Sequence, residues 1–384
     1  MHKHQHPVNC VIPPHMLEKI ATNGTVAQKA LAISTLKATE QMRGQRRALS
    51  DFAGAVSRIA VVGGKERIIY DAKNGLSLPG TIVRREEDGP VSDVAVNEAF
   101  DGSGATYDLY KDVYNRNSID NNGMRMDSTV HYRKGYDNAF WNGEQMVYGD
   151  GDEDQPVEDR LFNRFTIAID IIGHELTHGV TQFEAKLVYS YQPGALNESM
   201  SDVFGSLVKQ RHLNHTAAQA DWIIGEGLFT PNVNGDGIRS MKTPGNAYND
   251  PVLGKDPQPG HMNDYVNTTS DNGGVHINSG IPNHAFYITA MELGGYAWEK
   301  AGQIWYATLR DRLISNSQFQ DCANLTYSVA ADLFGAGSIE QMAVKKGWAE
   351  VGITVEGPPT PPPPEPGGGC LESLLRLIGA APAK

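Results

Sequence analysis

Cysteine is scarce in this chain, and two kinds of apolar segment that would assign it to a broad class are missing. Three cysteines occur among the 384 residues, namely Cys10, Cys322 and Cys370. So few thiols do not make the disulfide framework of a small secreted domain. The sequence contains no apolar run of membrane-spanning length, and its first residues lack the apolar stretch of a standard secretory signal. The sequence therefore predicts neither a disulfide scaffold nor a membrane span.

Positive charge is also in deficit. The formal net charge is −12 at pH 7, so no basic surface for nucleic acid is indicated. An acidic balance favours solubility and is compatible with cation binding. We expect a monomer without a nucleic-acid or membrane partner. It is expected to be either exported by a route that needs no standard signal or kept in the cytoplasm.

One stretch carries a chemical signature, the pattern His174-Glu175-Leu176-Thr177-His178 inside an apolar segment. On an α-helix, residues four apart lie on one face. The two histidines can then grip one zinc ion while Glu175 lies beside the water that is to be activated. Taken alone, the pattern also fits a helix that carries two histidines by chance.

A second segment offers the missing ligand. Glu198 follows His178 by 20 residues, and zinc hydrolases often bind the metal through two His and one Glu, with a position left for water. Asp202 lies one helical turn after Glu198, where an acid can accept the free N–H of a ligating imidazole. A solvated acidic helix start is the alternative, but the flanking apolar residues indicate a buried face.

Composition divides the chain into four parts. Residues 1–48 indicate a small helical element that ends in a basic, protease-accessible stretch, and they are either an ordinary helical hairpin or a propeptide. Residues 49–182 alternate short β-type runs with turns, whereas residues 183–356 have helical apolar spacing. Residues 357–384 form a Pro- and Gly-rich linker and a short tail. We predict an α+β fold in which a cleft separates a β-rich lobe from a helical lobe.

Local patterns place the elements within these parts. Strands are expected at residues 59–62, 68–70, 81–83, 128–132, 139–141 and 145–148. Helices are expected at residues 16–20, 26–41, 105–115, 197–211, 282–293, 298–315, 319–334 and 338–351, besides the segment with the two histidines.

Several separated motifs resemble those of the thermolysin family of zinc metallopeptidases, and more narrowly its protealysin-like branch with a short propeptide. The zinc-ligand motifs stand at residues 174–178 and 194–202, a substrate-facing strand at 138–143 and a Gly-rich proton-donor loop at 271–280. Ile12-Pro13-Pro14 resembles the Pro-Pro motif of such propeptides. The resemblance implies a two-lobed fold with one catalytic zinc in the cleft. It also implies a zymogen that its own propeptide inhibits.

The resemblance also implies catalytic roles. Glu175 would act as general base on water and then pass the proton to the leaving amine. Tyr189 and His276 would donate hydrogen bonds to the oxyanion, and Asp271 would orient His276. From spacing alone, Tyr189 is one of several tyrosines in a strand-like run.

Substrate binding follows from the same resemblance. Asn138 and the backbone of Ala139 would hold a peptide as an added strand, and Arg239 would contact a carbonyl on the primed side. Four apolar residues match the walls of a hydrophobic S1′ pocket, which implies cleavage before bulky apolar residues such as Leu or Phe. They fit an ordinary core equally well: Phe162, Ile171, Ile224 and Ile238.

One departure concerns calcium. The best-known relatives bind a pair of calcium ions through acids near the third-ligand helix, and Asp170, Asp221 and Glu226 are retained here. Lys209 and Ile223 stand where two further acids are expected. An ammonium among the remaining carboxylates can replace a calcium ion electrostatically. We therefore expect the double calcium site to be lost.

Cys10 precedes the Pro-Pro motif directly. A thiolate there could occupy the open zinc position and silence the zymogen, or Cys10 could be a chance thiol. Two function classes remain open. One is an endopeptidase zymogen whose prosegment is removed by self-cleavage near Arg47. The other is a non-enzymatic or permanently latent zinc protein whose prosegment is an interaction module. Glu175 favours the endopeptidase, because a silent relative needs no base.

Overall fold

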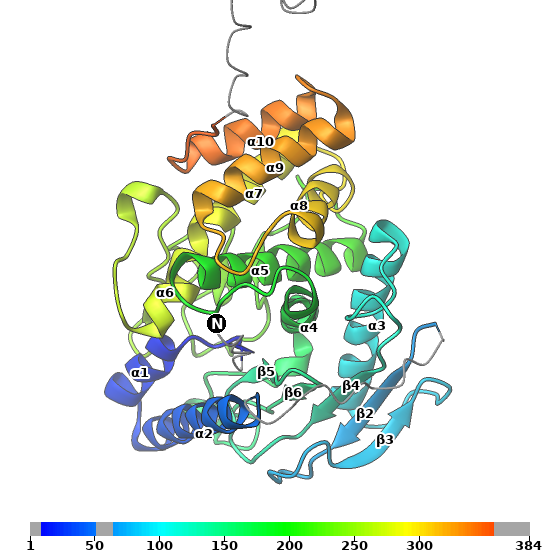
Figure 1. Cartoon of the computed structure of the whole chain (residues 1–384). Coiled ribbons are helices and arrows are strands. Elements are labelled where there is room, and N and C mark those ends of the chain that lie inside the picture. The colour runs from blue at the N-terminus through cyan, green and yellow to red at the C-terminus, as the bar shows by residue number, and fades with distance from the viewer. Residues whose placement is uncertain (1–8, 51–63, 357–384) are drawn as a thin grey trace, which may run out of the picture.

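The protein is described by a computed structural model that covers residues 9–50 and 64–356. Within these ranges a β-rich part and a helical part meet at two long helices, α4 (Ile169–Phe183) and α5 (Tyr191–Leu213), which pack against each other at the centre (Figure 1). This arrangement confirms the predicted division into a β-rich and a helical half. The predicted strand at 59–62 and the tail at 357–384 lie outside the described residues.

A six-stranded sheet of order β1-β5-β6-β4-β2-β3 forms the β-rich part. Its strands are β1 (Asn9–Cys10), β2 (Arg67–Asp71), β3 (Thr81–Arg85), β4 (Met126–Val130), β5 (Ala139–Trp141) and β6 (Met146–Tyr148). β4 runs parallel to β2 and β6, and the other pairs are antiparallel. The predicted strands that lie in the described residues are therefore present. The addition of β1, from the N-terminal segment, was not foreseen.

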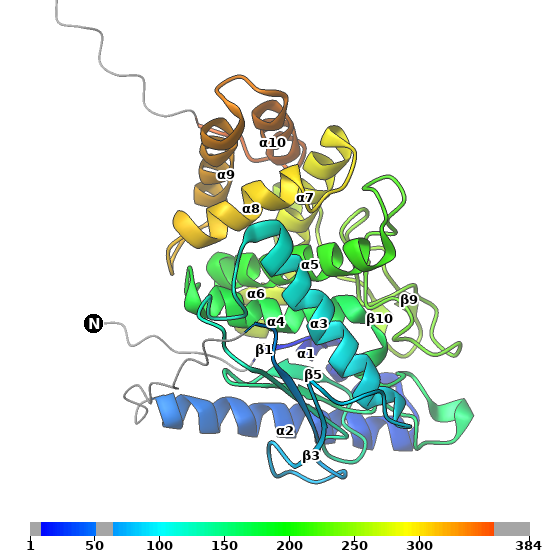
Figure 2. The same cartoon turned by 90° about the vertical axis from the view of Figure 1, so that its right-hand side faces the viewer.

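Helices cover both faces of this sheet. α3 (Val94–Tyr114) and α4 pack on one face, and α2 (Val26–Ser50) runs along the other (Figure 2). α2 is held there by a small buried cluster in which Ala38 meets Phe140 of β5 and Val147 of β6. α1 (Pro14–Asn23) begins with a proline at its first position, where no backbone N–H is needed.

α3 starts well before the helix predicted at 105–115. The Asp93 carboxylate caps its first turn by accepting from the backbone N–H groups of Ala95 and Val96. The glycines inside α3 concealed the helical pattern, yet one of them is required by packing. A Cβ at Gly102 would come within 2.4 Å of Ile172 Cδ1 on α4. Tertiary contact thus overrides the low helix propensity of glycine.

The helical part contains α6 (Asp271–Asn278), α7 (Gly280–Leu293), α8 (Lys300–Asp311), α9 (Phe319–Phe334) and α10 (Ile339–Glu350). The helices predicted at 282–293, 298–315, 319–334 and 338–351 are thus confirmed with small shifts at their ends. Short elements complete the described chain. They are β7 (Ile223–Ile224), β8 (Arg239–Ser240), β9 (Asn249–Asp250), β10 (Gly254–Lys255) and the 3-10 turns Val157–Asp159, Phe165–Ile167 and Met262–Asp264. Across the described ranges, no helix has both the length and the apolar character that a bilayer crossing requires.

Candidate active site

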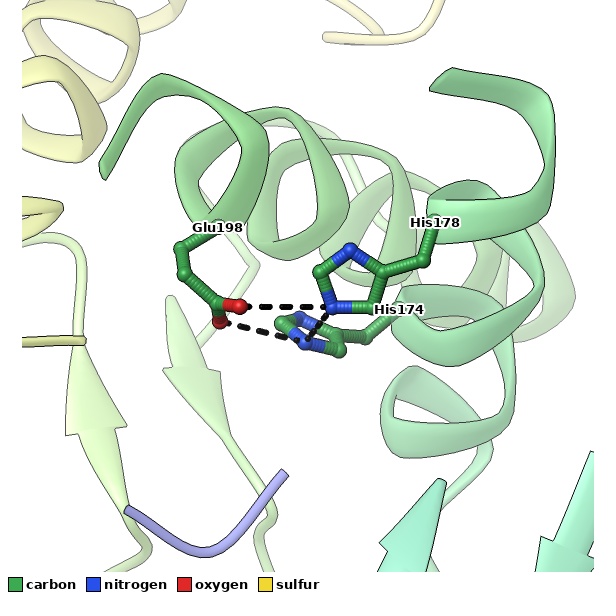
Figure 3. A group of neighbouring side chains, drawn as sticks. All are labelled: His174, His178 and Glu198. Carbon is green, nitrogen blue, oxygen red and sulfur yellow. Dashed lines mark hydrogen bonds and ion pairs between the residues drawn. The ribbon is translucent and has the colours of Figure 1, made fainter. Parts of the chain in front are cut away.

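The imidazoles of His174 and His178 project from α4 toward the carboxylate of Glu198 on α5 (Figure 3). Their Nε2 atoms are 3.0 Å apart. Glu198 Oε2 lies 3.5 Å from His174 Nε2, and Glu198 Oε1 lies 3.4 Å from His178 Nε2. The two helices can approach so closely because position 205 of α5 is a glycine. A Cβ at Gly205 would come within 2.4 Å of the Asp170 carbonyl oxygen on α4. All three side chains are buried.

Their hydrogen bonds leave these three groups as converging acceptors. His174 Nδ1 donates to Asp202 Oδ1 at 2.8 Å, and His178 Nδ1 donates to Asn197 Oδ1 at 2.8 Å. With protons on both Nδ1 atoms, both Nε2 atoms present lone pairs. Burial lowers the pKa of His178 to about 3, which favours its neutral form. Glu198 Oε2 is buried without a hydrogen-bond partner.

Two nitrogen lone pairs and a carboxylate oxygen are costly to bury together unless a cation lies between them. Although burial acts in the opposite direction, the nearby imidazoles of His276, His178 and His174 lower the pKa of Glu198, so it is held ionised. Two nitrogens and one oxygen are the donor set of many catalytic zinc sites. Among the described residues, this is the group of His, Cys, Asp and Glu whose ligand atoms all lie within 4.8 Å of one another. The residues present therefore fit zinc.

Asp202 lies behind the cluster and binds more than the predicted histidine. It accepts from Arg239 Nε and Nη2 at 2.8 and 2.7 Å, and from Asn283 Nδ2 at 2.8 Å. Burial raises the pKa of Asp202, but Arg239 and His174 outweigh it and hold the pKa well below its usual range. Asn283 and Asn197 were missed in the sequence, since neither belongs to a spaced pattern of acids and histidines.

Glu175 points one oxygen at a backbone donor and keeps the other unpartnered. Its Oε2 accepts from the Trp141 N–H of β5 at 2.9 Å, whereas its Oε1 is buried without a hydrogen bond. Burial, and next the charge of Glu198, raise the pKa of Glu175 well above its usual range. A carboxylate with an unpartnered oxygen and a raised proton affinity is suited to accept a proton.

Tyr189, His276 and Asp271 lie on the other side of Glu198. The Tyr189 hydroxyl donates to Glu198 Oε1 and is 3.2 Å from His276 Nε2. Asp271 Oδ1 accepts from His276 Nδ1 at 2.6 Å, and its Oδ2 accepts from the His276 backbone N–H at 2.8 Å. Burial opposes the charge on His276, but Asp271 and Glu198 raise its pKa. His276 is therefore equipped to donate from Nε2.

The segment around His276 begins as the expected Gly-rich loop and ends as a helical turn. The element α6 begins at Asp271, but its first residues do not have helical backbone angles. Asn272, Gly273 and Gly274 have φ values of 52°, 88° and 77° there. Such left-handed residues are not part of a regular helix, which is why the glycines suggested a loop.

The expected peptide-binding residues are already engaged by the chain's own N-terminal segment. Asn138 Oδ1 accepts from the Ile12 N–H at 2.9 Å, and Asn138 Nδ2 donates to the Ile12 carbonyl at 3.3 Å. The Val11 N–H donates to the Ala139 carbonyl at 3.2 Å. Arg239 Nη1 donates to the Val11 carbonyl at 3.2 Å. The segment thus lies along β5 as an added antiparallel strand.

Cys10 does not present its thiol to the metal cluster. Its side chain belongs to the buried cluster on the α2 face of the sheet, with Tyr132, Tyr136 and Phe140. Alternate residues of a strand face opposite sides, so the thiol points away from α4. The Cys10 carbonyl oxygen faces the site instead, 3.0 Å from His276 Nε2. The structure does not support the hypothesis that a Cys10 thiolate occupies the open zinc position.

The four S1′ candidates are buried in one large hydrophobic cluster that also contains Val11. Their exposed fractions are 1% or less, so burial does not separate a pocket wall from core, and the pocket stays a prediction. The residues are Phe162, Ile171, Ile224 and Ile238.

Lys209 of α5 supplies a cation to a second cluster of acids. Its Nζ is 3.1 Å from Asp170 Oδ2, 2.9 Å from Asp221 Oδ1 and 3.6 Å from Glu226 Oε2. It also donates to the Ile223 carbonyl at 2.9 Å. Burial lowers the pKa of Lys209, but Asp170 and Asp221 reverse this and raise it. The ammonium therefore stays charged.

Comparison with known proteins gives the same picture from an independent direction. Family models described as "Thermolysin metallopeptidase, catalytic domain" and "Thermolysin metallopeptidase, alpha-helical domain" match residues 33–182 and 185–353. The chain is 48% identical to the "Extracellular metalloprotease" of Pectobacterium carotovorum subsp. carotovorum over 351 residues, covering 91% of this chain and 97% of that protein. It is 49% identical to "Protease PrtS" of Photorhabdus sp. (strain Az29) over 350 residues, covering 90% and 92%.

A solved structure is similar over nearly the same length. The structure described as "Precursor of Protealysin, Metalloproteinase from Serratia proteamaculans" superposes with a TM-score of 0.81 at 51% identity, covering 90% of this chain and all of that one. Family models that span both halves, and relatives of this similarity, leave one assignment. The chain belongs to the thermolysin family, and it is a zinc metalloendopeptidase.

Proposed function

We propose that this metallopeptidase is made as a zymogen in which residues 1–48 inhibit the catalytic part until they are removed. The observation that carries the proposal is the strand addition of the N-terminal segment to β5, with backbone groups of Val11 and Ile12 bound by Asn138, Ala139 and Arg239. A peptide bound in this way excludes another from the same place. The similarity to a structure described as a precursor supports the same reading.

The proposed organisation has four parts. Residues 1–48 form the propeptide, 49–182 the β-rich catalytic lobe, 183–356 the helical lobe, and 357–384 a linker with a tail. The proposed partners are protein or peptide substrates and the chain's own propeptide.

The proposed mechanism assigns one task to each side chain of the site. Zinc held by His174, His178 and Glu198 would supply a Lewis acid for the scissile carbonyl and for water. Glu175 takes the proton from water through its unpartnered Oε1 and returns it to the leaving amine. Asp202 fixes His174 in the tautomer that leaves Nε2 free.

The oxyanion that develops on the substrate needs fixed donors. The Tyr189 hydroxyl and His276 Nε2 lie 3.2 Å apart and can both face one substrate oxygen. Asp271 keeps the imidazole of His276 oriented and favours its charged form. Donation from both groups therefore becomes stronger as negative charge builds up.

We further propose cleavage on the amino side of bulky apolar residues. Val11, which Arg239 contacts, lies in the same buried hydrophobic cluster as the four pocket candidates. A pocket lined by Phe162, Ile171, Ile224 and Ile238 would reward apolar side chains by burial.

Two finer statements concern location and calcium. We infer export from the cell, because the Pectobacterium relative is named an extracellular metalloprotease, and the route is left open. We also propose that Lys209 makes the calcium pair unnecessary, because its ammonium already neutralises Asp170 and Asp221.

The alternative is a permanently latent or non-enzymatic zinc protein, and one experiment separates the two. Purified full chain is incubated with casein, with and without a zinc chelator, and its mass is followed with time. We expect a lag in casein hydrolysis that ends when the chain is cleaved near the proposed boundary at residue 48 and its mass falls accordingly. With chelator we expect no activity. Glu175→Gln should lower kcat by about 10²–10⁴-fold, while Glu292→Gln on the exposed side of α7 should match the unmodified chain. Full activity without any lag would contradict the zymogen proposal.

A further inference from the structure

The peptide bond between Cys10 and Val11 lies where the donors and the metal cluster of the site meet. The Cys10 carbonyl oxygen is 3.0 Å from His276 Nε2. The same nitrogen is 3.2 Å from the Tyr189 hydroxyl and 3.6 Å from Glu198 Oε2. A carbonyl in this position accepts a hydrogen bond from a buried imidazole, beside the carboxylate that completes the metal cluster. That is the environment in which an amide carbon becomes electrophilic.

The backbone on both sides of this bond is held in extended form. The Val11 N–H donates to the Ala139 carbonyl, and the Val11 carbonyl accepts from Arg239 Nη1, both at 3.2 Å. On the other side Asn9 pairs with Trp141 of β5. Restraint of this kind removes much of the orientational cost of reaction.

The proton acceptor is next to the same stretch. Trp141, the partner of Asn9 in the sheet, donates its N–H to Glu175 Oε2 at 2.9 Å. The other oxygen of Glu175 is buried without a hydrogen bond. Glu175, the proposed base, is therefore hydrogen-bonded to Trp141, the residue that pairs with Asn9 of β1.

The basic stretch near Arg47 offers no such geometry. It lies within α2, which extends from Val26 to Ser50. A helical backbone cannot pair along β5 as a strand without unwinding, because its N–H and C=O groups are used within the helix. The extended bond at Cys10–Val11 needs no such rearrangement.

We propose that the Cys10–Val11 bond is the chain's own first substrate, hydrolysed by the site that it occupies. The proposal rests on the proposed endopeptidase function. One water molecule adds to the Cys10 carbonyl carbon and gives a proton to Glu175, and the bond to the Val11 nitrogen breaks as that nitrogen receives the proton. The products are a carboxylate at Cys10 and an amine at Val11. The cut separates β1 from α1 and α2, so the helices lose their covalent link to the pairing of β1 with β5, while Val11 and Ile12 stay attached to α1.

A pair of isotopes reports on this bond alone. Among Cys10, Cys322 and Cys370, the first is the one followed by valine. Full-length chain labelled with carbonyl-¹³C cysteine and ¹⁵N valine therefore gives a single cysteine-to-valine cross-peak in a carbonyl-to-amide correlation spectrum. In zinc-loaded chain we expect this peak to disappear while mass spectrometry detects a fragment that begins at Val11. Glu175→Gln should slow both changes by about 10²-fold or more, and Glu292→Gln should not.

A second readout requires no hydrolysis. In the Glu175→Gln chain without metal, removing the donor with His276→Ala should move the ¹³C shift of this carbonyl upfield. His284→Ala, a matched change on α7 outside the site, should leave the shift in place. An unchanged shift in the His276 variant would show that the carbonyl is not held at the donor and would overturn the proposal.

The hydrolytic outcomes separate this proposal from the function on which it rests. If casein is hydrolysed while the cross-peak keeps its intensity and no fragment beginning at Val11 forms, the internal-substrate proposal fails and the endopeptidase function stands. If neither casein nor the bond is cut, both fail.

Discussion

The helices α4 and α5 bury two clusters of charge between them, and the clusters are completed in different ways. Toward the middle, His174, His178 and Glu198 direct lone pairs at one point, so their cation has to come from outside. At one end, Asp170 of α4 meets Lys209 of α5, so the cation belongs to the chain. A metal ion offers open coordination positions for chemistry, whereas an ammonium offers only charge and hydrogen bonds. Catalysis needs the open coordination positions of a metal ion, whereas an ammonium is sufficient to neutralise buried carboxylates in the fold.

A third buried group consists of two carboxyls whose negative charge is reduced by a proton instead of a cation. Asp137 and Asp152 interact in the loops after β4 and β6, and burial together with their mutual repulsion raises the pKa of Asp137 well above its usual range. The Asp137 backbone N–H donates to the Thr35 hydroxyl of α2 at 3.2 Å, so this pair lies under α2, which belongs to the proposed propeptide. Asp154 is the other charged group that acts on both members.

The largest expected effect breaks the metal cluster. Glu198→Gln removes the carboxylate charge that holds the ion, and we expect zinc content and peptidase activity to be lost together. Elemental analysis and calorimetric zinc titration of the purified chain measure this. Glu292→Gln serves as the matched control. Full zinc occupancy in the Glu198 variant would show that the three converging acceptors are not the metal site.

The second effect breaks the ammonium cluster. Lys209→Met leaves Asp170 and Asp221 without their cation, and we expect unfolding free energy to fall by about 2–3 kcal/mol, below the cost for a fully buried pair because Asp221 is partly exposed. Denaturant unfolding measures the loss, with exposed Lys345→Met as control. Calcium should restore stability to Lys209→Glu and leave the unmodified chain unaffected. Tight binding of two calcium ions by the unmodified chain would refute the replacement of calcium by Lys209.

A smaller effect sharpens the role of the residues behind the metal. Asn283→Ala removes one donor from Asp202, and Arg239 continues to hold that carboxylate. Zinc affinity should fall by about 10-fold, with the fold and its unfolding curve little changed. A competition titration against a chelator of known affinity detects this. An unchanged affinity would limit Asn283 to packing.

The smallest effect concerns the buried carboxyl pair of Asp137 and Asp152. The pKa of Asp137 is raised while α2 covers it, so its contribution to the docking of α2 is complete at low pH and is lost as pH rises through that raised pKa. One linked proton changes docking by at most about tenfold per pH unit. Hydrogen exchange of α2 against pH follows it. Asp137→Asn should flatten the profile, and exposed Asp101→Asn should not. A profile that Asp137→Asn leaves intact would assign the dependence to other groups.

The sequence predicted most where side chains of one kind recur at the spacing of a single helix. The spacing of His174 and His178 placed both on one face of α4. Glu198 could be named because zinc hydrolases often add one Glu to two His, and the apolar residues around it indicated a buried face. The helices at 319–334 and 338–351 followed from apolar spacing for the same reason. Those are local properties, which a single segment displays by itself.

What the sequence left hidden depends on contacts between distant segments. Asn283 reaches Asp202 only because α7 packs on α5. The early start of α3 needed the close approach of Gly102 to Ile172, and the direction of the Cys10 side chain was set by the pairing of β1 with β5. No periodicity in the chain announces any of these.

The pairing of β1 with β5 has a consequence for what the enzyme can digest. The hydrogen bonds of Val11 and Ile12 at this sheet edge are made through their backbone amides and carbonyls. A substrate that binds in the proposed way must therefore arrive with its main chain uncovered, and a compact helix or an already paired strand cannot dock. A substrate protein must therefore unfold locally before it binds, and the side-chain preference of the site selects only among segments that are already unfolded.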